Sequence, residues 1–417
     1  MAAFEAGFDA IAADLPAIRD ELARLVACDT SFPPGDGYAA FADLVEAMVR
    51  PLGLPTRRVT VPPALWRGGG AAGERVNLIA GAGRGRPVCS LYFHTDTVPP
   101  GDGWTHDPLV LTPVGDRLVG RGTADMKGSI AAVLAALRAA QRHGVALEFD
   151  PVLLLCTDEE GGLYPGIRYL AEQGLVEGHL LSFNGGAAPR IWAGCFGSFD
   201  LRVTVTGRAA HSGDPGAGVN AVEAAVPLLE ALLALKPRVE ARVSALPPPP
   251  HNQGRPLHGL LTIAAAHGGQ KGSSLPASFE VLINRRYAPE EAFEAALAEL
   301  HETIAAAMRG GPALGAAVEL VGHLAPVSDP TGPHWPRWQA ALSRGFGFAP
   351  AAFRAWGSST SSDMGWVQRA GIREILLGGL SRPDNNVHGA DEFTTGADLI
   401  ALARSVLAYL AKQPPRD

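Results

Sequence analysis

Short runs of apolar residues recur along this chain of 417 residues. The clearest are VNLIA at 76–80, VCSLYF at 88–93, VLLLC at 152–156 and HLLSF at 179–183. Runs of this length without polar alternation are typical of strands buried on both faces. Helical patterns lie between or before them, at about 5–27, 37–52, 128–142 and 165–174. Strands that alternate with helices predict an α/β fold around a mainly parallel sheet.

The pattern changes at about residue 196 and changes back at about 325. Between these points, half-exposed strands and two helices follow one another in the order β-α-β-β-α-β, which is typical of a ferredoxin-like α+β unit. The α/β pattern then resumes with EILLG at 374–378 and a last helix at 396–411. A chain of this length exceeds what one hydrophobic core usually holds. We therefore predict a doubly wound α/β domain with a mixed sheet (residues 1–195 and 325–417), interrupted by an inserted domain (residues 196–324).

The composition argues against several classes of protein. The net charge is −7 and no run of Lys or Arg forms a basic stripe, so we expect neither nucleic acid nor an anionic membrane as the main partner. No stretch of about twenty apolar residues predicts a membrane span, and the N-terminus lacks the pattern of a signal peptide. The four cysteines form no CxxC pair. These features predict a globular protein of the reducing cytoplasm.

Polar side chains follow the predicted strands at the points where those strands end. The residues are His94 and Asp96 after VCSLYF, Asp158-Glu159-Glu160 after VLLLCT, Asn184 after HLLSF, His388 after EILLG, and Asp125 in the turn GRGTADMKG. Ligands of an open α/β sheet bind beyond the carboxyl ends of its strands, so we expect these groups at one edge. Their charges would repel one another unless a cation held them. Oxygen and imidazole ligands suit zinc, manganese or cobalt, and the pattern therefore predicts a divalent-metal site.

Each of these residues also has an ordinary structural interpretation. His94 alone could be a hydrogen-bonded histidine at a strand end, residues 158–160 could form a solvated acidic turn, and Asp125 could cap a helix. Asp96, however, stands on the same strand face as His94, where a carboxylate can take the imidazole N–H and direct the other nitrogen at a metal. The joint pattern favours the metal site.

Four motifs, in this order and spacing, closely resemble those of the M20 metallopeptidase family: LYFHTDTVPPGDGW, GRGTADMKG, TDEEGG and VTGRAAHSGDPGAGVNA. FEVLINRRYAPEE and NNVHGADEF continue the resemblance, which runs from about residue 75 to the C-terminus. The family includes acetylornithine deacetylase, succinyl-diaminopimelate desuccinylase, aminoacylase-1 and carboxypeptidase G2. The resemblance implies a zinc-peptidase catalytic domain with an inserted lid and dimerisation domain, and hence a homodimer through that lid.

The resemblance also implies roles for the metal-site residues. His94 would bind one metal ion, Asp125 would bridge two, and Glu160 with His388 would complete the second position. Glu159 would be the general base, since a carboxylate beside the metal can take a proton from the bound water and deliver it to the leaving nitrogen.

Further roles are implied around that centre. Asp96 would orient His94. In the inserted domain, His211 would stabilise the tetrahedral oxyanion from across the dimer, and Arg286 would bind a substrate carboxylate. The remaining candidates for substrate binding are Asn220, Ser273 and Gly379.

The sequence departs from the family at Asn184, where the resemblance implies a Glu or Asp as third ligand of the His94 metal. An amide oxygen is neutral and a poorer ligand for zinc, so one of the two metals should bind more weakly. Three interpretations follow. The first, which we favour, is an enzyme with one firmly held metal or with a metal that tolerates an amide oxygen; the second is an engineered replacement of Asp by Asn, and the third is a binding protein that has lost catalysis. The intact Glu159 argues against the last.

Other departures concern the substrate. Serines stand at 273 and 274 where the family carries an amide side chain, and Asn284 replaces the acid of a D-R-R pattern. We predict a metal-dependent hydrolase that cleaves a C–N bond of a small molecule such as an N-acyl amino acid. The alternatives are an aminohydrolase that releases ammonia from an aromatic amine such as a nitroanthranilate, and a catalytically impaired binding protein.

Overall fold

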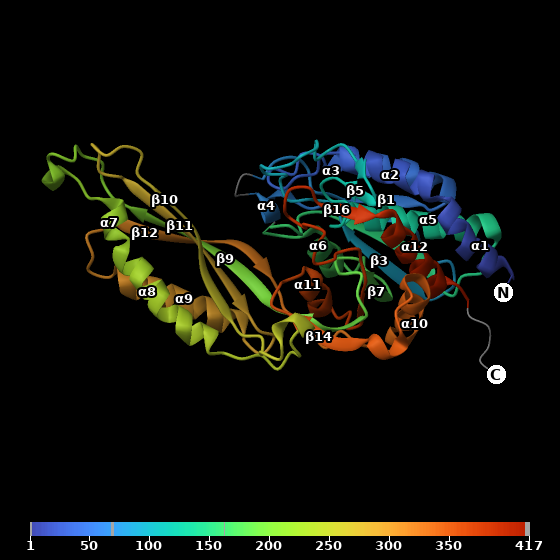
Figure 1. Cartoon of the computed structure of the whole chain (residues 1–417). Helices are drawn as coiled ribbons and strands as arrows, with labels where there is room; N and C mark the ends of the chain where they lie inside the picture. Colours follow the sequence, from blue (N-terminus) through green and yellow to red (C-terminus); the bar gives the residue numbers. More distant parts are fainter. Residues whose placement is uncertain (1, 68–70, 162, 413–417) are drawn as a thin grey trace. The chain divides into compact units, whose positions relative to one another are not determined.

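The computed structural model describes residues 2–67, 71–161 and 163–412, which divide into two compact units (Figure 1). The first unit contains Met1–Trp192, Asp329–Ala355 and Trp366–Asp417, and the second contains Ala193–Ser328 and Trp356–Gly365. The segment Trp356–Gly365 thus groups with the second unit, although the sequence pattern places it in the first domain. It is held there because Arg286 Nη1 donates to the main-chain oxygen of Ser359 and to Ser361 Oγ, both at 3.2 Å.

The main sheet of the first unit has six strands in the order β1-β2-β6-β3-β7-β15. Their bounds are Thr56–Thr60 (β1), Val76–Ala80 (β2), Val88–His94 (β3), Asp150–Cys156 (β6), His179–Ser182 (β7) and Ile375–Leu377 (β15). β6, β3, β7 and β15 run parallel, whereas β1 and β2 pair antiparallel at one edge. β6 is buried along its whole length, which explains why its sequence shows no polar alternation. The predicted doubly wound mixed sheet is confirmed, and its parallel strands end at a common edge.

Helices surround this sheet, and α5 packs against α1, α2 and α12. Their bounds are Ala2–Ala13 (α1), Leu15–Ala27 (α2), Tyr38–Val49 (α3), Pro63–Trp66 (α4), Lys127–His143 (α5), Gly166–Glu172 (α6), Trp335–Phe346 (α10), Met364–Arg369 (α11) and Gly396–Leu410 (α12). The pattern over 5–27 forms two helices, because Pro16 lacks a backbone N–H and is tolerated only in the first turn of α2. Across the described ranges, no helix combines the length and apolar character that a membrane span requires.

The second unit is built on a four-stranded antiparallel sheet in the order β10-β11-β9-β12. The bounds of its elements are Gly197–Thr206 (β9), Ala221–Ala224 (α7), Val226–Glu240 (α8), Leu260–Gly268 (β10), Ser278–Tyr287 (β11), Phe293–Met308 (α9) and Gly315–Leu324 (β12). This order of elements is that of a ferredoxin-like unit. Alternate residues of β9 and β11 are buried, and together with α8 and α9 they form a separate hydrophobic core.

Two smaller sheets complete the fold, in the orders β16-β5-β4 and β13-β8-β14. The first contains Phe393–Thr395 (β16), Arg117–Val119 (β5) and Thr112–Val114 (β4), and the second contains Val327–Ser328 (β13), Arg190–Cys195 (β8) and Arg354–Ser358 (β14). The antiparallel pairing of β16 with β5 matters for the site, because it joins the segment after β15 to the segment that leads into α5.

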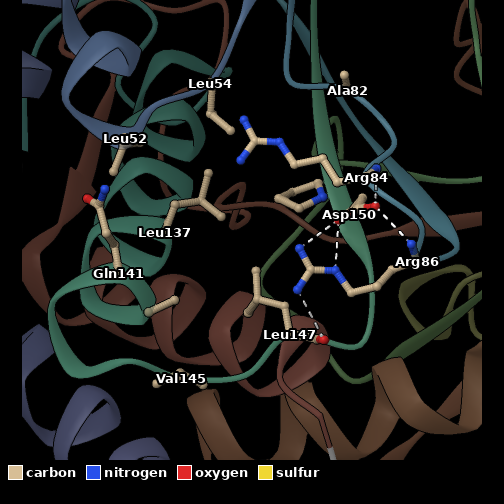
Figure 2. Close-up of a pocket in the computed structure, with 12 residues that line it drawn as sticks. Leu52, Leu54, Ala82, Arg84, Arg86, Leu137, Gln141, Val145, Leu147 and Asp150 are labelled. Carbon is tan, nitrogen blue, oxygen red and sulfur yellow. Dashed lines mark hydrogen bonds and ion pairs between the residues drawn. The ribbon is translucent and has the colours of Figure 1, made fainter.

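A pocket of about 210 Å³ lies around the start of β6 (Figure 2). Leu52, Leu137 and Leu147 contribute apolar walls, and Asp150 is the first residue of the strand. Arg86 Nε donates to Asp150 Oδ1 at 2.7 Å, so the acidic group here has a partner within the pocket. Because the candidate site follows the last residue of β6, this pocket lies at the other end of the strand and is separate from it.

Candidate metal centre

Possible metal ligands from three separate segments meet at the carboxyl edge of the main sheet. His94 is the last residue of β3, Asp125 precedes α5, and Glu160 follows β6. Their ligand atoms all lie within 4.8 Å of one another. His94 Nε2 is 3.0 Å from Asp125 Oδ1, and His388 Nε2 is 3.4 Å from Asp125 Oδ2 and 3.1 Å from Glu160 Oε2. The fold therefore brings together the four residues that the sequence places in the centre.

The chemistry of this group of donors fits a divalent cation. The hydrogen bonds to Asp125 and Glu160 raise the pKa of His388 to about 10. Burial opposes a charge on His94, yet its hydrogen bond with Asp125 raises the pKa of that imidazole well above its ordinary value. Both histidines thus lie in a field that strongly favours a positive charge, and a metal ion would satisfy the same carboxylates.

Asp96 holds both His94 and the turn that carries Glu160. His94 Nδ1 is 3.0 Å from the main-chain oxygen of Asp96, whereas the carboxylate Oδ1 of Asp96 is 3.8 Å away. The carboxylate Oδ2 instead accepts a hydrogen bond of 2.8 Å from Glu160 N. The predicted partner residue of His94 is therefore in place, but the contact runs through its carbonyl. Contacts of this kind, made by residues around the ligands, orient the imidazole and fix the turn that carries the carboxylate ligand.

Glu392, which was not among the predicted site residues, supports the turn that carries Asp125. Its side chain is fully buried and accepts hydrogen bonds from the backbone N–H groups of Gly122, Ala124 and Asp125, at 3.0, 2.9 and 3.0 Å. Arg121 Nη1 donates to the same carboxylate at 2.7 Å. The pairing of β16 with β5 brings this acid beside the turn. The only available signal was its position in NNVHGADEF, a motif that also carries His388.

A second hydrogen-bond network that the sequence did not predict holds Asp158, the first residue of the acidic turn 158–160. Asp158 is buried in the left-handed backbone conformation (φ 63°). Its carboxylate accepts hydrogen bonds of 2.8 Å from the Tyr38 hydroxyl and from Arg75 Nε. The guanidinium of Arg75 also stacks over the Trp66 ring, 4.1 Å from its centroid. Burial raises the pKa of Asp158 to about 6. These contacts fix the turn that presents Glu159 and Glu160.

Asn184 and Glu159 meet at the end of β7. Asn184 Nδ2 donates to Glu159 Oε1 at 2.7 Å. The backbone here is closely packed against the loop after β15, because a Cβ atom on Gly379 would clash with the main-chain oxygen of Gly185. Gly379 therefore has to be a glycine, and its φ of 148° agrees. The amide of Asn184 faces the proposed base.

The other predicted substrate residues lie in the second unit, where each has local contacts. His211 is exposed, and its Nδ1 accepts a hydrogen bond from Gly213 N at 3.0 Å. Asn220 caps α7, since its side chain accepts from the backbone N–H groups of the first turn. Ser273 accepts a main-chain hydrogen bond from Ser212 N at 3.1 Å. Arg286 is hydrogen-bonded to neutral oxygen atoms. Asn220 thus has a structural role, whereas the imidazole of His211 is accessible to solvent.

Comparisons with known proteins agree with this picture. Residues 90–413 match the family model of peptidase family M20/M25/M40. The chain is 29% identical to the succinyl-diaminopimelate desuccinylase of Acidiphilium cryptum over 340 residues, which cover 79% of this chain and 84% of that protein. It is 30% identical to the acetylornithine deacetylase of Edwardsiella ictaluri over 52% of this chain and 54% of that protein.

Solved structures share the fold. The dipeptidase Dug1p of Saccharomyces cerevisiae superposes with a TM-score of 0.80 at 15% identity, over 97% of each chain. Human carnosine dipeptidase 1 superposes with a TM-score of 0.73 at 16% identity, over 97% of this chain and 98% of that one. Enzymes of the matched family are hydrolases that use divalent metals. This chain belongs to peptidase family M20/M25/M40, and it is a hydrolase that acts on carbon–nitrogen bonds.

Proposed function

We propose that this protein hydrolyses the amide bond of a small N-acyl amino acid, with Glu159 as the general base beside a divalent metal site. The convergence of His94, Asp125 and Glu160, with His388 against the last two, is the observation that carries the proposal. The names of the curated relatives, a desuccinylase and a deacetylase, support acyl amino acids as the substrate class.

The metal positions are unequal. Asp125, Glu160 and His388 offer two carboxylates and one imidazole, a set that would hold zinc, manganese or cobalt. On the other side, His94 and Asp125 have the amide of Asn184 as the remaining candidate ligand, which would hold a second ion more weakly. When bound, the metal would polarise the scissile carbonyl and lower the pKa of water.

The chain's own residues supply the rest of the chemistry. Glu159 stands directly before the ligand Glu160 and acts electrostatically on His94, so its carboxylate lies where a proton could be taken from water and passed to the leaving nitrogen. In the second unit, the exposed His211 would donate to the oxyanion from across the dimer, and Arg286 would bind a substrate carboxylate. Asp96 would orient His94 through the contact described above.

We further propose that the second unit acts as a lid and as the dimerisation surface. Its separate hydrophobic core supports this role, since such a unit can close or pair as one body. Light scattering of the full chain should then give twice the monomer mass of 43.4 kDa. A single monomeric species across micromolar concentrations would refute the dimer.

A substrate panel with two variants tests the activity. Metal-loaded wild type is assayed against acylamino acids and aromatic amines, including a nitroanthranilate, alongside Glu159→Gln and the exposed control Glu177→Gln. We expect release of the acyl group, a loss of at least about 100-fold in kcat for Glu159→Gln, consistent with general base catalysis, and no change for Glu177→Gln. Ammonia release from the aromatic amine alone would establish the aminohydrolase instead. Less than about one metal equivalent, with Glu159→Gln indistinguishable from wild type, would indicate a binding protein.

A further inference from the structure

Asn184 stands at a position where the sequence suggests a metal ligand, yet its observed partner is the proposed base. We infer that Asn184 is a positioning residue for Glu159, whose carboxylate it holds through its amide N–H, and that metal binding at the position formed by Asp125, Glu160 and His388 does not depend on it. The inference rests on the proposed function, because it requires Glu159 to be the group that moves the proton.

The contact itself is short and charge-assisted. Asn184 Nδ2 lies 2.7 Å from Glu159 Oε1. Hydrogen bonds to an ionised carboxylate are shorter and roughly twice as strong as those between neutral groups. The amide therefore restrains the Glu159 side chain. The backbone of Glu159 is already set by three hydrogen bonds of its two neighbours: Asp158 accepts from Tyr38 and Arg75, and Glu160 N donates to Asp96.

The backbone around Asn184 is fixed well enough to serve as such a support. Gly378 N donates to the main-chain oxygen of Ser182 at 2.9 Å, and Ser381 N donates to that of Gly185 at 3.2 Å. These bonds tie the end of β7 to the loop after β15 on both sides of residue 184. Asn184 is itself half-buried. A fixed backbone and partial burial limit the positions that the short side chain of Asn184 can reach, so its amide can hold Glu159 in one geometry.

The surrounding charges favour an amide at position 184 when only the metal position formed by Asp125, Glu160 and His388 is filled. Asp125, Glu160 and His388 already provide three ligands whose contacts with one another are 3.1 and 3.4 Å. A carboxylate at position 184 would face Glu159 at hydrogen-bond distance with a like charge, which is costly unless a cation lies between them. An amide donates to the same oxygen without that cost.

Measurements of metal binding and of catalysis distinguish the two possible roles of Asn184, as a metal ligand or as a positioning residue for Glu159. Wild type, Asn184→Ala, Asn184→Asp and the distant control Asn252→Ala are loaded with Co²⁺. For each we measure the metal content, the affinity by chelator competition, the visible Co²⁺ spectrum, and kcat and KM for the best acylamino acid. Because an outer contact is typically worth 10–100-fold, we expect Asn184→Ala to lower kcat by about that factor. Its KM should stay within about twofold, and its metal content, affinity and spectrum should match wild type.

Two further comparisons complete the test. In the Glu159→Gln background, Asn184→Ala should cause little additional loss of kcat, since both changes remove the same function. Asn184→Asp should lower kcat as well, because Glu159 loses its hydrogen-bond donor and faces a second negative charge instead.

Several outcomes would overturn the inference. A tenfold loss of Co²⁺ affinity or an altered Co²⁺ spectrum in Asn184→Ala would show that the amide is a ligand. An unchanged kcat in Asn184→Ala, or a rise in kcat with a second metal equivalent in Asn184→Asp, would also refute it. If Glu159→Gln is fully active, the proposed function itself fails. If Glu159→Gln is inactive while Asn184→Ala is normal, only the present inference fails.

Discussion

Replacement of Glu392 by Gln tests whether the buried acid that supports the Asp125 turn also sets the metal affinity. One carboxylate oxygen of Glu392 accepts from Ala124 N and Asp125 N, and the other accepts from Gly122 N and Arg121 Nη1. A glutamine keeps the shape but exchanges one oxygen for an NH₂ group, which would face two donors. Two hydrogen bonds would be lost, and the buried Arg121 would lose its counter-charge. Breaking a buried ion pair costs about 3–5 kcal/mol in the free energy of unfolding.

Urea unfolding followed by tryptophan fluorescence measures this loss in the right part of the chain, because six of the seven tryptophans lie in the first unit. We expect the free energy of unfolding of apo Glu392→Gln to be about 3–5 kcal/mol lower than that of wild type. Chelator competition should show metal binding about 10–100-fold weaker, because Asp125 would be less well held. Asp391→Asn is the matched control, since this neighbouring acid contacts Thr105 outside the turn. A destabilised variant with wild-type metal affinity would refute the reasoning.

Three more predictions concern the first unit. Burial, together with His334 and Arg337, lowers the pKa of His179 to about 3, so below pH 6.5 the unfolded chain takes up a proton that the native state does not. The contribution of His179 to the free energy of unfolding should therefore fall by about 2 kcal/mol between pH 7 and pH 5, and a His179→Asn variant with the same pH dependence as wild type in urea titrations would contradict this. Trp338→Ala should destabilise by about 3–5 kcal/mol, since the ring is fully buried and donates to a main-chain oxygen; a loss below 1 kcal/mol by urea unfolding would disprove it. Tyr38→Phe leaves an Asp158 oxygen without its donor, so the free energy of unfolding should drop by about 1–3 kcal/mol with a lower kcat, and steady-state kinetics identical to wild type would show that the turn does not need it.

The sequence alone was sufficient to place the sheet and most of the centre. Apolar runs such as 152–156 are buried strands because a strand covered on both faces leaves no position for a polar side chain. Polar residues at the ends of those runs then share one edge, because parallel strands end together. His94 and Glu160 could be predicted for this reason, and Asp125 and His388 from the motifs GRGTADMKG and NNVHGADEF. The contacts of 3.0 to 3.4 Å among these residues could not be predicted.

The tertiary structure decided which residues hold the centre in place. Glu392 reaches the Asp125 turn only because β16 pairs with β5, and Asp158 is paired with Tyr38, which lies 120 residues earlier in the chain. Asn184 stands at a position where the sequence indicates a metal ligand, yet its side chain donates a hydrogen bond to Glu159. A buried hydrogen-bonding group must find a partner wherever the fold brings one, and no local pattern records which partner that is. The sequence therefore determined which chemical groups meet at the sheet edge, and the packing of distant segments determined how each group is oriented there.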